Sequence, residues 1–552
     1  MPSPVEPFAS TGVVREAIDP RRFSWIRPLT SDYADRFDAL AALFAGNPAD
    51  PAAWRATLAR ITARRRDRTA MPAALARQLE RRGAPAEARQ AAAELAQPTT
   101  VAILTGQQAG LFGGPLYTLL KAVTTVQLAR HVRASYGVPA VPVFWVDTED
   151  HDWAEVKSAH VLDRDGNVAH VTAADVAGAG RLPIASLSLE ASSTVALDQL
   201  AELLPPTEFT GDVLAALRRR YQAGTGVGSA CAGWIEDLLG RHGLVVFEAD
   251  DPSVKPLAAD LFARELSARR TAPLAREAGA MMARLGHTAQ VEPAEDSVAL
   301  FYLNGTARLP IRARGDQFQI GDDVRPCADV EAEARQHPER FSPNVLLRPL
   351  VQDRLFPTAC YVAGPAELAY QAQLGGVYRE YDVDAPLLYS RVSATLIDAG
   401  AVRFFERSGL PLEALQPQDD SALNQLLARE LPPGLDRAID ETDQLIRDRV
   451  AALKAAVVSV DPTLSGTVDT TVDRMRETMK GLHGKVVQAA KRKDDTLRRQ
   501  FVRTRSLAFP EGQPQERYLS LAFFVNRYGL ALGDRLLETL PLATDKHYVL
   551  AL

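Results

Sequence analysis

The 552-residue sequence predicts an α/β fold, in which a doubly wound parallel sheet carries inserted connectors and an antiparallel helical coiled-coil arm. From residue 98 to about 415, short apolar runs alternate with helical stretches, as in open parallel sheets. From 416 to 508 the apolar spacing is purely helical. The chain is also too long for one simple core, so we expect several structural units.

Residues 1–97 are expected to form a helical segment that packs on this core. Ala, Leu, Arg and Glu dominate from Ser31 to about Gln97. Phe37, Leu40 and Leu43, and later Trp54 and Leu58, recur at helical spacing. Two or three amphipathic helices account for the pattern.

The core begins with the run VAILTGQQAGLFGGP after Thr99, which indicates a strand that ends in a glycine-rich turn. The helical stretch LYTLLKAVTTVQLARHV and a second strand over Val138–Val146 follow. Two parallel strands joined by a helix is the simplest interpretation. Further strands are predicted at Leu244–Phe247, Ser297–Leu303, Leu346–Leu350, Cys360–Ala363 and Leu387–Tyr389.

Two insertions are expected in the core, at about 158–240 and 290–340. Short alternating runs with glycine and charged residues predict hairpins within Ser158–Ser188 and Ser297–Ile320. A helical stretch over Leu257–Leu285 separates the two insertions.

The predicted arm, residues 416–508, is a helical hairpin with Asp461-Pro462 as its turn. We expect a homodimer through this arm, although the same helices could simply cap the core. The basic stretch from Lys491 to Arg505 is either a solvated helix face or an anion site. Residues 509–552 are apolar enough to return to the core.

Composition favours small-molecule chemistry. The net charge of −6 offers no general attraction to nucleic acid, and no apolar run is long enough to span a membrane. The first twenty residues lack the pattern of a secretory signal, so we expect a cytoplasmic protein. Three widely spaced cysteines predict no metal site and are interpreted as packing residues.

The first candidate site is the glycine-rich segment that joins the first core strand to its helix. Backbone N–H groups and the helix dipole could hold a phosphate or carboxylate there. The spacing matches neither a dinucleotide fingerprint nor a P-loop, and a tight turn is the alternative interpretation. The candidate anion-binding residues are Thr105, Gly106, Gln107, Gln108, Gly110, Gly113 and Gly114.

The second candidate site, predicted to be catalytic, is the cluster Glu149, Asp150, His151 and Asp152. It follows the second strand, at the edge where open α/β sheets place ligands. Its carboxylates could bind an ammonium group or Mg²⁺, and the imidazole could act as a general base. A solvated loop is the alternative.

A third polar cluster repeats the strand-to-helix arrangement. Arg348 could pair with a ligand carboxylate or phosphate, or form a structural ion pair with Asp353 or Glu367. The substrate-binding or anion-binding candidates here are Asn344, Arg348, Gln352, Gly364, Glu367 and Arg391.

Three groups of residues together resemble the cysteine ligases of bacillithiol biosynthesis, the BshC family. They are Thr105–Phe112 with Gly114-Pro115, Phe144-Trp145 with Glu149–Asp152, and Leu347-Arg348-Pro349 with Gly364-Pro365 and Glu367. The resemblance covers nearly the whole chain. It implies a Rossmann-like core related to nucleotidyltransferases, a coiled-coil arm that promotes dimerisation, and addition of L-cysteine to glucosaminyl-malate.

The resemblance further implies that the glycine loop and the acidic cluster flank one pocket. Amide formation requires an activated carboxyl group, so ATP, with Mg²⁺, is the expected cofactor, and its product is ADP or AMP. The chain lacks the H-x-G-H histidine pair of nucleotidyltransferases, which argues against adenylate chemistry by that route. The alternative is a nucleotide-binding or anion-binding dimeric scaffold without turnover.

Overall fold

The computed structural model describes residues 13–190, 192–429, 434–493 and 495–552. They divide into two compact units, the first running to Ile397 and resuming with Pro514–Leu552, the second comprising Asp398–Gln513. Residues 398–415 thus fall in the second unit. The chain leaves the first unit, builds the second, and then returns.

A five-stranded parallel sheet forms the centre of the first unit and confirms the predicted fold class. Its strand order is β13-β12-β2-β3-β6. The strands span β2 Val101–Gln108, β3 Ala140–Asp147, β6 Val245–Glu248, β12 Thr358–Ala363 and β13 Leu387–Ser390. Four of the predicted strands and the apolar run after Thr99 form these five strands.

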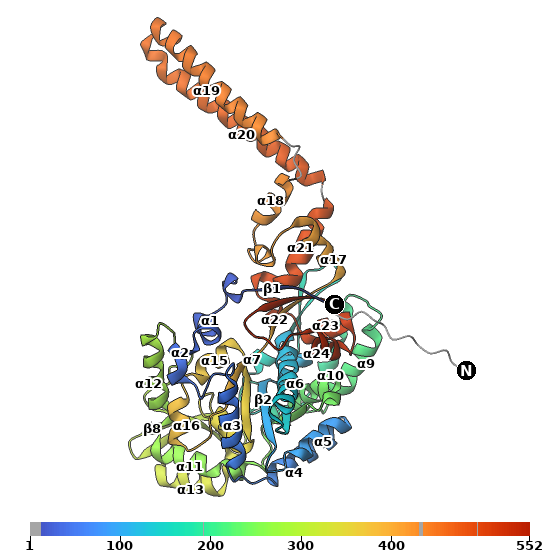
Figure 1. Cartoon of the computed structure of the whole chain (residues 1–552), viewed down its shortest axis with the longest axis vertical. Coiled ribbons are helices and arrows are strands. Elements are labelled where there is room, and N and C mark those ends of the chain that lie inside the picture. The colour runs from blue at the N-terminus through green and yellow to red at the C-terminus, as the bar shows by residue number, and fades with distance from the viewer. Residues whose placement is uncertain (1–12, 191, 430–433, 494) are drawn as a thin grey trace, which may run out of the picture. The chain divides into compact units, whose positions relative to one another are not determined.

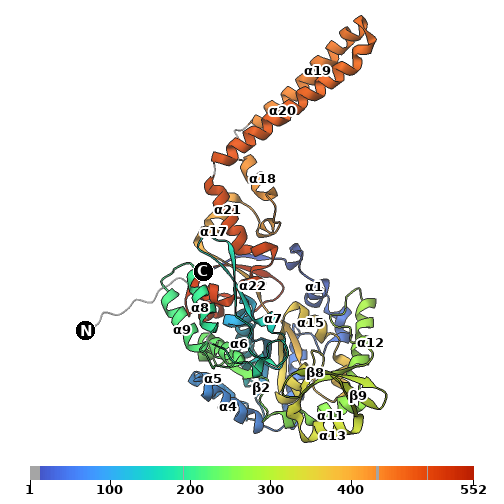
Figure 2. The same cartoon turned by 180° about the vertical axis from the view of Figure 1, so that it is seen from behind.

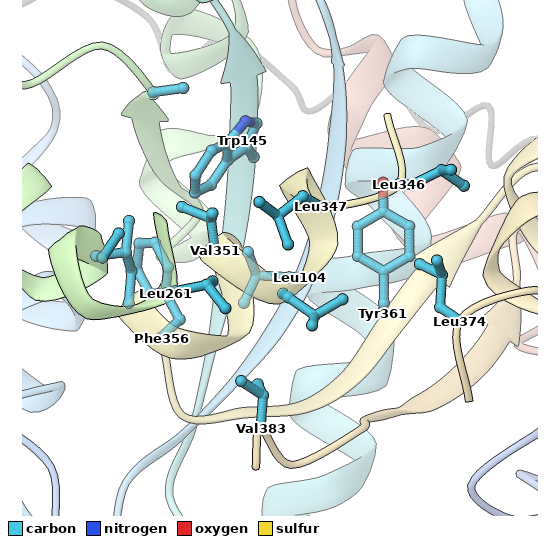
Figure 3. Close-up of a cluster of buried hydrophobic side chains, with 14 of the residues drawn as sticks. Leu104, Trp145, Leu261, Leu346, Leu347, Val351, Phe356, Tyr361, Leu374 and Val383 are labelled. Carbon is cyan, nitrogen blue, oxygen red and sulfur yellow. The ribbon is translucent and has the colours of Figure 1, made fainter. Parts of the chain in front are cut away.

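Helices cover both faces of this sheet. On one face α6 (Leu116–Tyr136) and α3 (Pro51–Ala63) pack against Val101, Ile103 and Val362. On the other face Leu104, Trp145 and Tyr361 meet apolar side chains such as Val351 and Phe356 (Figure 3). Figure 1 shows α6 beside β2. The two-sided burial explains why the strand sequences are continuously apolar.

The prediction of a strand at Leu346–Leu350 is wrong. This run opens helix α14 (Arg348–Leu355). The Asn344 side chain accepts hydrogen bonds from the Leu346 and Leu347 N–H groups, and Pro349 lies in the first helical turn. Both features favour a helix start.

The N-terminal segment is helical as expected, with one addition. Its helices are α1 (Pro28–Asp35), α2 (Phe37–Leu40), α3, α4 (Ala70–Arg82) and α5 (Ala86–Glu94). Strand β1 (Val13–Ile18) precedes them and pairs with β15 (His547–Ala551), which also pairs with β14 (Ser393–Ile397). Most of β1 is exposed, so it lacks a buried apolar pattern.

Both predicted insertions contain hairpins. The first holds β4 (Ser158–Leu162) and β5 (Val168–Thr172), then helices α8 (Ser192–Leu203), α9 (Thr210–Arg220) and α10 (Val227–Leu239). The second is an antiparallel sheet, visible in Figure 2 beside α11 and α13. Its order is β10 (Asp323–Pro326), β9 (Gln317–Ile320), β8 (Arg308–Arg314), β7 (Ser297–Leu303) and β11 (Phe341–Pro343). The Ser297–Leu303 strand therefore belongs to an insertion.

The remaining helices of the first unit connect these parts. They are α7 (Trp153–Val156), α11 (Ala259–Ala268), α12 (Thr271–Arg284), α13 (Cys327–Gln336), α15 (Pro365–Gln371), α16 (Gly375–Glu380), α22 (Gln515–Tyr518), α23 (Leu521–Tyr528) and α24 (Leu532–Thr539). From Pro514 the C-terminal segment belongs to the first unit, where α24 contacts α6. No described helix is long and apolar enough to cross a membrane.

The second unit is entirely helical in its described part. It comprises α17 (Ala399–Ser408), α18 (Ser421–Arg429), α19 (Leu435–Val460), α20 (Ser465–Lys493) and α21 (Asp495–Ala508). Helices α19 and α20 form the predicted hairpin (Figure 1), and Lys454 Nζ lies 2.6 Å from Asp469 Oδ1 across it. Residue 494, within the predicted basic stretch, lies outside the described residues.

Candidate active site

A cavity of about 300 Å³ lies at the carboxyl ends of β2, β3 and β12. Side chains from α6, α7, α14, α15 and α22 complete its lining. This is the edge at which open α/β sheets bind ligands, because strand-to-helix loops diverge there. We call this cavity the inner chamber.

The two glutamines that end β2 point to opposite faces of the sheet. Gln107 Nε2 donates to the Tyr117 hydroxyl at 3.1 Å, and its Oε1 accepts from Lys121 Nζ at 2.9 Å. Gln108 Nε2 donates to Asp150 Oδ2 at 2.8 Å. Both glutamines line the inner chamber, as strand alternation at its rim allows. The predicted glutamine pair is therefore part of the cleft.

A buried ion pair supports the floor of this chamber. Lys121 Nζ lies 2.5 Å from Glu367 Oε2 and donates to the Gly106 carbonyl at 2.7 Å. Glu367 also accepts from the Tyr361 hydroxyl at 2.7 Å and from the Gly364 N–H at 2.6 Å. Burial lowers the pKa of Lys121. Burial alone would raise the pKa of Glu367, but the neighbouring Lys121 cation outweighs burial and lowers the pKa of Glu367.

Lys121 was not among the site residues predicted from the sequence. Its signal is a single lysine within the apolar helical stretch LYTLLKAVTTV, where a charged side chain needs a partner. Glu367 and Gly364, which were predicted, meet this lysine at the chamber.

Arg348 lies between polar neighbours in the same chamber. Its guanidinium donates to Gln352 Oε1 at 3.1 Å and to the Tyr370 hydroxyl at 3.0 Å, and its Nε lies 3.9 Å from Asp147 Oδ2. Neither Asp353 nor Glu367 forms an ion pair with it among the described residues. Its charge is thus only loosely compensated.

The other predicted members of this third cluster differ in role. Asn344 caps α14. Gln352 is fully buried beneath Arg348. Neither lines the inner chamber. Both therefore act through helix α14 and through Arg348.

Arg391 reaches the chamber from the loop after β13. Its guanidinium pairs with Glu516 of α22 at 2.6 Å and lies 5.6 Å from the centre of the Tyr117 ring. Arg517, the next residue of α22, lines the chamber as well. The sequence analysis missed Glu516 and Arg517 because they follow the core by more than 100 residues.

The glycine segment is arranged differently from the expectation. Thr105 and Gly106 belong to β2, and the Thr105 hydroxyl donates to the Val362 carbonyl. Beyond the strand, the Leu116 N–H at the start of α6 donates to the Leu519 carbonyl at 3.0 Å. The Gly113 N–H contacts the Gly110 carbonyl and the Tyr221 hydroxyl. These backbone donors have protein partners instead of facing open space.

Close packing explains the glycines of this turn. A Cβ on Gly113 would lie 2.7 Å from Trp234 Cδ1, and one on Gly110 would lie 2.8 Å from Gly114 Cα. The backbone φ angle is +90° at Gly113 and +70° at Gly114, a region that other residues rarely adopt. The structure thus gives the turn a packing role.

The predicted catalytic cluster does not line the inner chamber. Glu149 is buried in an ion pair with Lys255, and burial raises its pKa. Asp152 caps the short helix α7 by accepting from the Glu155 N–H. The chamber instead receives the carboxylates of Asp147, whose pKa burial raises, and Glu155.

Asp150 and His151 form a neighbouring group with Arg308 of the second insertion. Arg308 donates to Asp150 Oδ1 at 3.0 Å and lies 3.2 Å from His151 Nδ1. Partial burial would raise the pKa of Asp150, but Arg308 and the hydrogen bonds from His151 and Gln108 lower it. Gln108 connects this group to the chamber.

A second cavity of about 390 Å³ adjoins the first. Gln107, Gln108, Tyr117, Glu155 and Arg517 line both. We call it the outer chamber; its further lining includes Gly110, Gly114, Ser158, His160 and Tyr518. The His160 and Tyr518 rings stack with centroids 4.4 Å apart. The two chambers form one continuous set of neighbouring cavities with a shared wall.

Comparison with known proteins identifies relatives along the whole chain. Residues 17–392 match the family model described as "Bacillithiol biosynthesis BshC, N-terminal Rossmann-like domain". Residues 394–552 match the "Bacillithiol biosynthesis BshC, C-terminal coiled-coil domain".

Curated relatives carry a corresponding name, "Putative cysteine ligase BshC". A Salinibacter ruber protein is 34% identical over all of both chains. A Koribacter versatilis protein is 34% identical over 79% of this chain and 81% of its own. A Symbiobacterium thermophilum protein is 34% identical over 86% and 88%, respectively.

Proposed function

Because the chain belongs to the BshC family of bacillithiol biosynthesis, we propose that it is a cysteine ligase that joins L-cysteine to glucosaminyl-malate by an amide bond. The observation that carries this proposal is the two-chambered cleft at the carboxyl edge of the parallel sheet. Its inner chamber offers loosely compensated charges of both signs, from Asp147 and Arg348. Both substrates carry charges of both signs.

The reaction requires an activated carboxyl group, so ATP is the proposed source of activation. The neutral amine nitrogen of the sugar attacks the activated carbonyl carbon of cysteine and forms the C–N bond. The nitrogen releases one proton to water, and AMP or phosphate leaves with the electrons of the broken C–O bond. Arg348 and Arg517 supply positive charge for anionic groups in the cleft. Mg²⁺ would arrive with the nucleotide and need only one or two carboxylates, such as Glu155.

Self-association and location are further parts of the proposal. The hairpin of α19 and α20 exposes apolar side chains, including Leu445, Leu453 and Met475, which supports a homodimer through this arm. Cys231, Cys327 and Cys360 are all free thiols, as is usual in the reducing cytoplasm. No nucleic acid is needed in this scheme.

The decisive experiment is mass spectrometry of reactions containing the purified protein, glucosaminyl-malate, L-cysteine, ATP and Mg²⁺. We expect the cysteinyl product, with AMP indicating an adenylate route and ADP an acyl-phosphate route. Gln107→Ala and Asp150→Ala should remove most activity with the fold intact, while Glu202→Gln, an exposed change on α8, should not. Nucleotide binding without product would instead favour a scaffold.

A further inference from the structure

Trp145, which lines the inner chamber, has a buried indole N–H without a partner among the described residues. Trp145 is 1% exposed, and its Nε1 is buried with no hydrogen-bond partner among the described residues. Its ring packs edge-on against Phe247 and Phe356. A buried donor without an acceptor is costly, so such a group calls for an explanation.

The position of the ring points to the cleft. Trp145 lines the inner chamber, and its Cδ1, bonded to Nε1, would lie 3.6 Å from a Cβ on Gly106. This is an ordinary contact distance, so the five-membered ring lies beside residue 106 near the end of β2. Trp145 and Asp147 share one face of β3 because side chains alternate along a strand.

Two opposite charges accompany this donor. Asp147 Oδ2 and Arg348 Nε are 3.9 Å apart, too far for a direct hydrogen bond. By contrast, Lys121 is tightly paired with Glu367, and Arg391 with Glu516. The loosely paired Asp147 carboxylate complements the ammonium group of an α-amino acid, and the Arg348 guanidinium with the indole N–H complements its carboxylate.

We propose that Asp147, Trp145 and Arg348 form the subsite for the amino-acid substrate. Asp147 accepts hydrogen bonds from the ammonium group, and Arg348 and the Trp145 N–H donate to the carboxylate. The indole nitrogen is covered in this structure, so ligand entry must shift a neighbouring side chain. This inference rests on the proposed ligase function and places the amino acid in the inner chamber.

Isothermal titration with three thiols, in the presence of glucosaminyl-malate, tests the subsite. L-Cysteine carries both groups, cysteamine lacks the carboxylate and 3-mercaptopropionate lacks the ammonium. We expect both analogues to bind the wild-type protein at least tenfold more weakly than L-cysteine, since each leaves a charged group without its partner. Equal affinities for all three thiols, or no binding of L-cysteine, would overturn the subsite.

Variants assign each contact. Trp145→Phe keeps an aromatic ring but removes the donor, so it should weaken L-cysteine binding about tenfold and leave cysteamine unaffected. Asp147→Asn should weaken L-cysteine but not 3-mercaptopropionate. Trp234→Phe is the matched control, because the N–H of Trp234 is also buried without a partner in the described part of the chain, but Trp234 does not line the chamber.

The outcomes separate this inference from the proposed function. Suppose that the wild-type protein forms product and that Trp145→Phe binds L-cysteine as tightly as the wild-type protein does. The subsite is then wrong, and the ligase function stands. If no product forms but L-cysteine binding falls in Trp145→Phe and not in Trp234→Phe, the subsite stands and the ligase reaction is wrong. Since the analogues probe the wild-type protein, an unstable variant cannot block the test.

Discussion

Replacing Lys121 with methionine removes the cation from the buried pair beneath the inner chamber. The Lys121 and Glu367 side chains are 3% and 18% exposed, so little water can compensate the remaining carboxylate. Breaking a buried pair by removing one partner costs about 3–5 kcal/mol. Because Glu367 keeps the hydrogen bonds from Tyr361 and Gly364, we expect the lower end, about 3 kcal/mol of unfolding free energy.

Urea unfolding followed by tryptophan fluorescence measures this loss. All five tryptophans precede residue 397, so the signal reports the first unit. Adding Glu367→Gln to Lys121→Met should recover about half of the loss, since no unpaired charge is left buried. Lys157→Met, which breaks an exposed pair with Asp175, should leave the midpoint unchanged. A wild-type midpoint in Lys121→Met, or a double variant as unstable as the sum of the singles, would refute the reasoning.

Three further changes have defined outcomes. Gly113→Ala should lower the free energy of chemical unfolding by about 3 kcal/mol, because it combines a positive φ with a clash against Trp234. Gly137→Ala, which has φ +66° but open space around it, should lower it by about 1 kcal/mol. Burial lowers the pKa of His547 to about 4, so the unfolded state binds more protons between pH 6.5 and 4. Stability should fall by about 3 kcal/mol as pH decreases through that window, and His547→Gln should reduce this dependence; equal pH slopes would contradict it. Glu149→Gln should lower the thermal midpoint by disrupting its buried pair; an unchanged midpoint with lost turnover would restore a catalytic role.

Periodicity predicted the elements whose burial is uniform along their length. The central strands are apolar on both faces, and the arm helices repeat every three or four residues, so each leaves a clear pattern. Leu346–Leu350 failed because a short apolar run fits a strand or a buried helix equally well. There the hydrogen bonds to Asn344 and the position of Pro349 in the first turn favour the helix.

The residues of the candidate site that lie at or just after the end of a core strand were the ones predicted from the sequence. Gln107, Gln108, Gly364 and Arg391 all line the inner chamber. Residues that arrive from elsewhere were missed, because the sequence does not show which distant segments meet. Lys121 comes from within a helix, and Arg517 from a segment beyond the helical unit.

The acidic cluster shows the same limit on a finer scale. The segment from Asp147 to Asp152 contains four carboxylates, and sequence position alone does not separate those that face the cleft from those that serve packing. The end of β3 gives Asp147 to the chamber, and the turn that follows gives Glu149 to Lys255.

The return of the chain at Pro514 has a consequence for biosynthesis. Glu516 pairs with Arg391, and Arg517 lines both chambers. The Leu519 carbonyl accepts the hydrogen bond from the Leu116 N–H at the start of α6. All three residues are translated after the entire helical unit. A ribosome-bound chain that has reached the arm already has its parallel strands but not a finished cleft. The segment that completes the cleft is therefore synthesised last, so partly synthesised chains should bind no substrate.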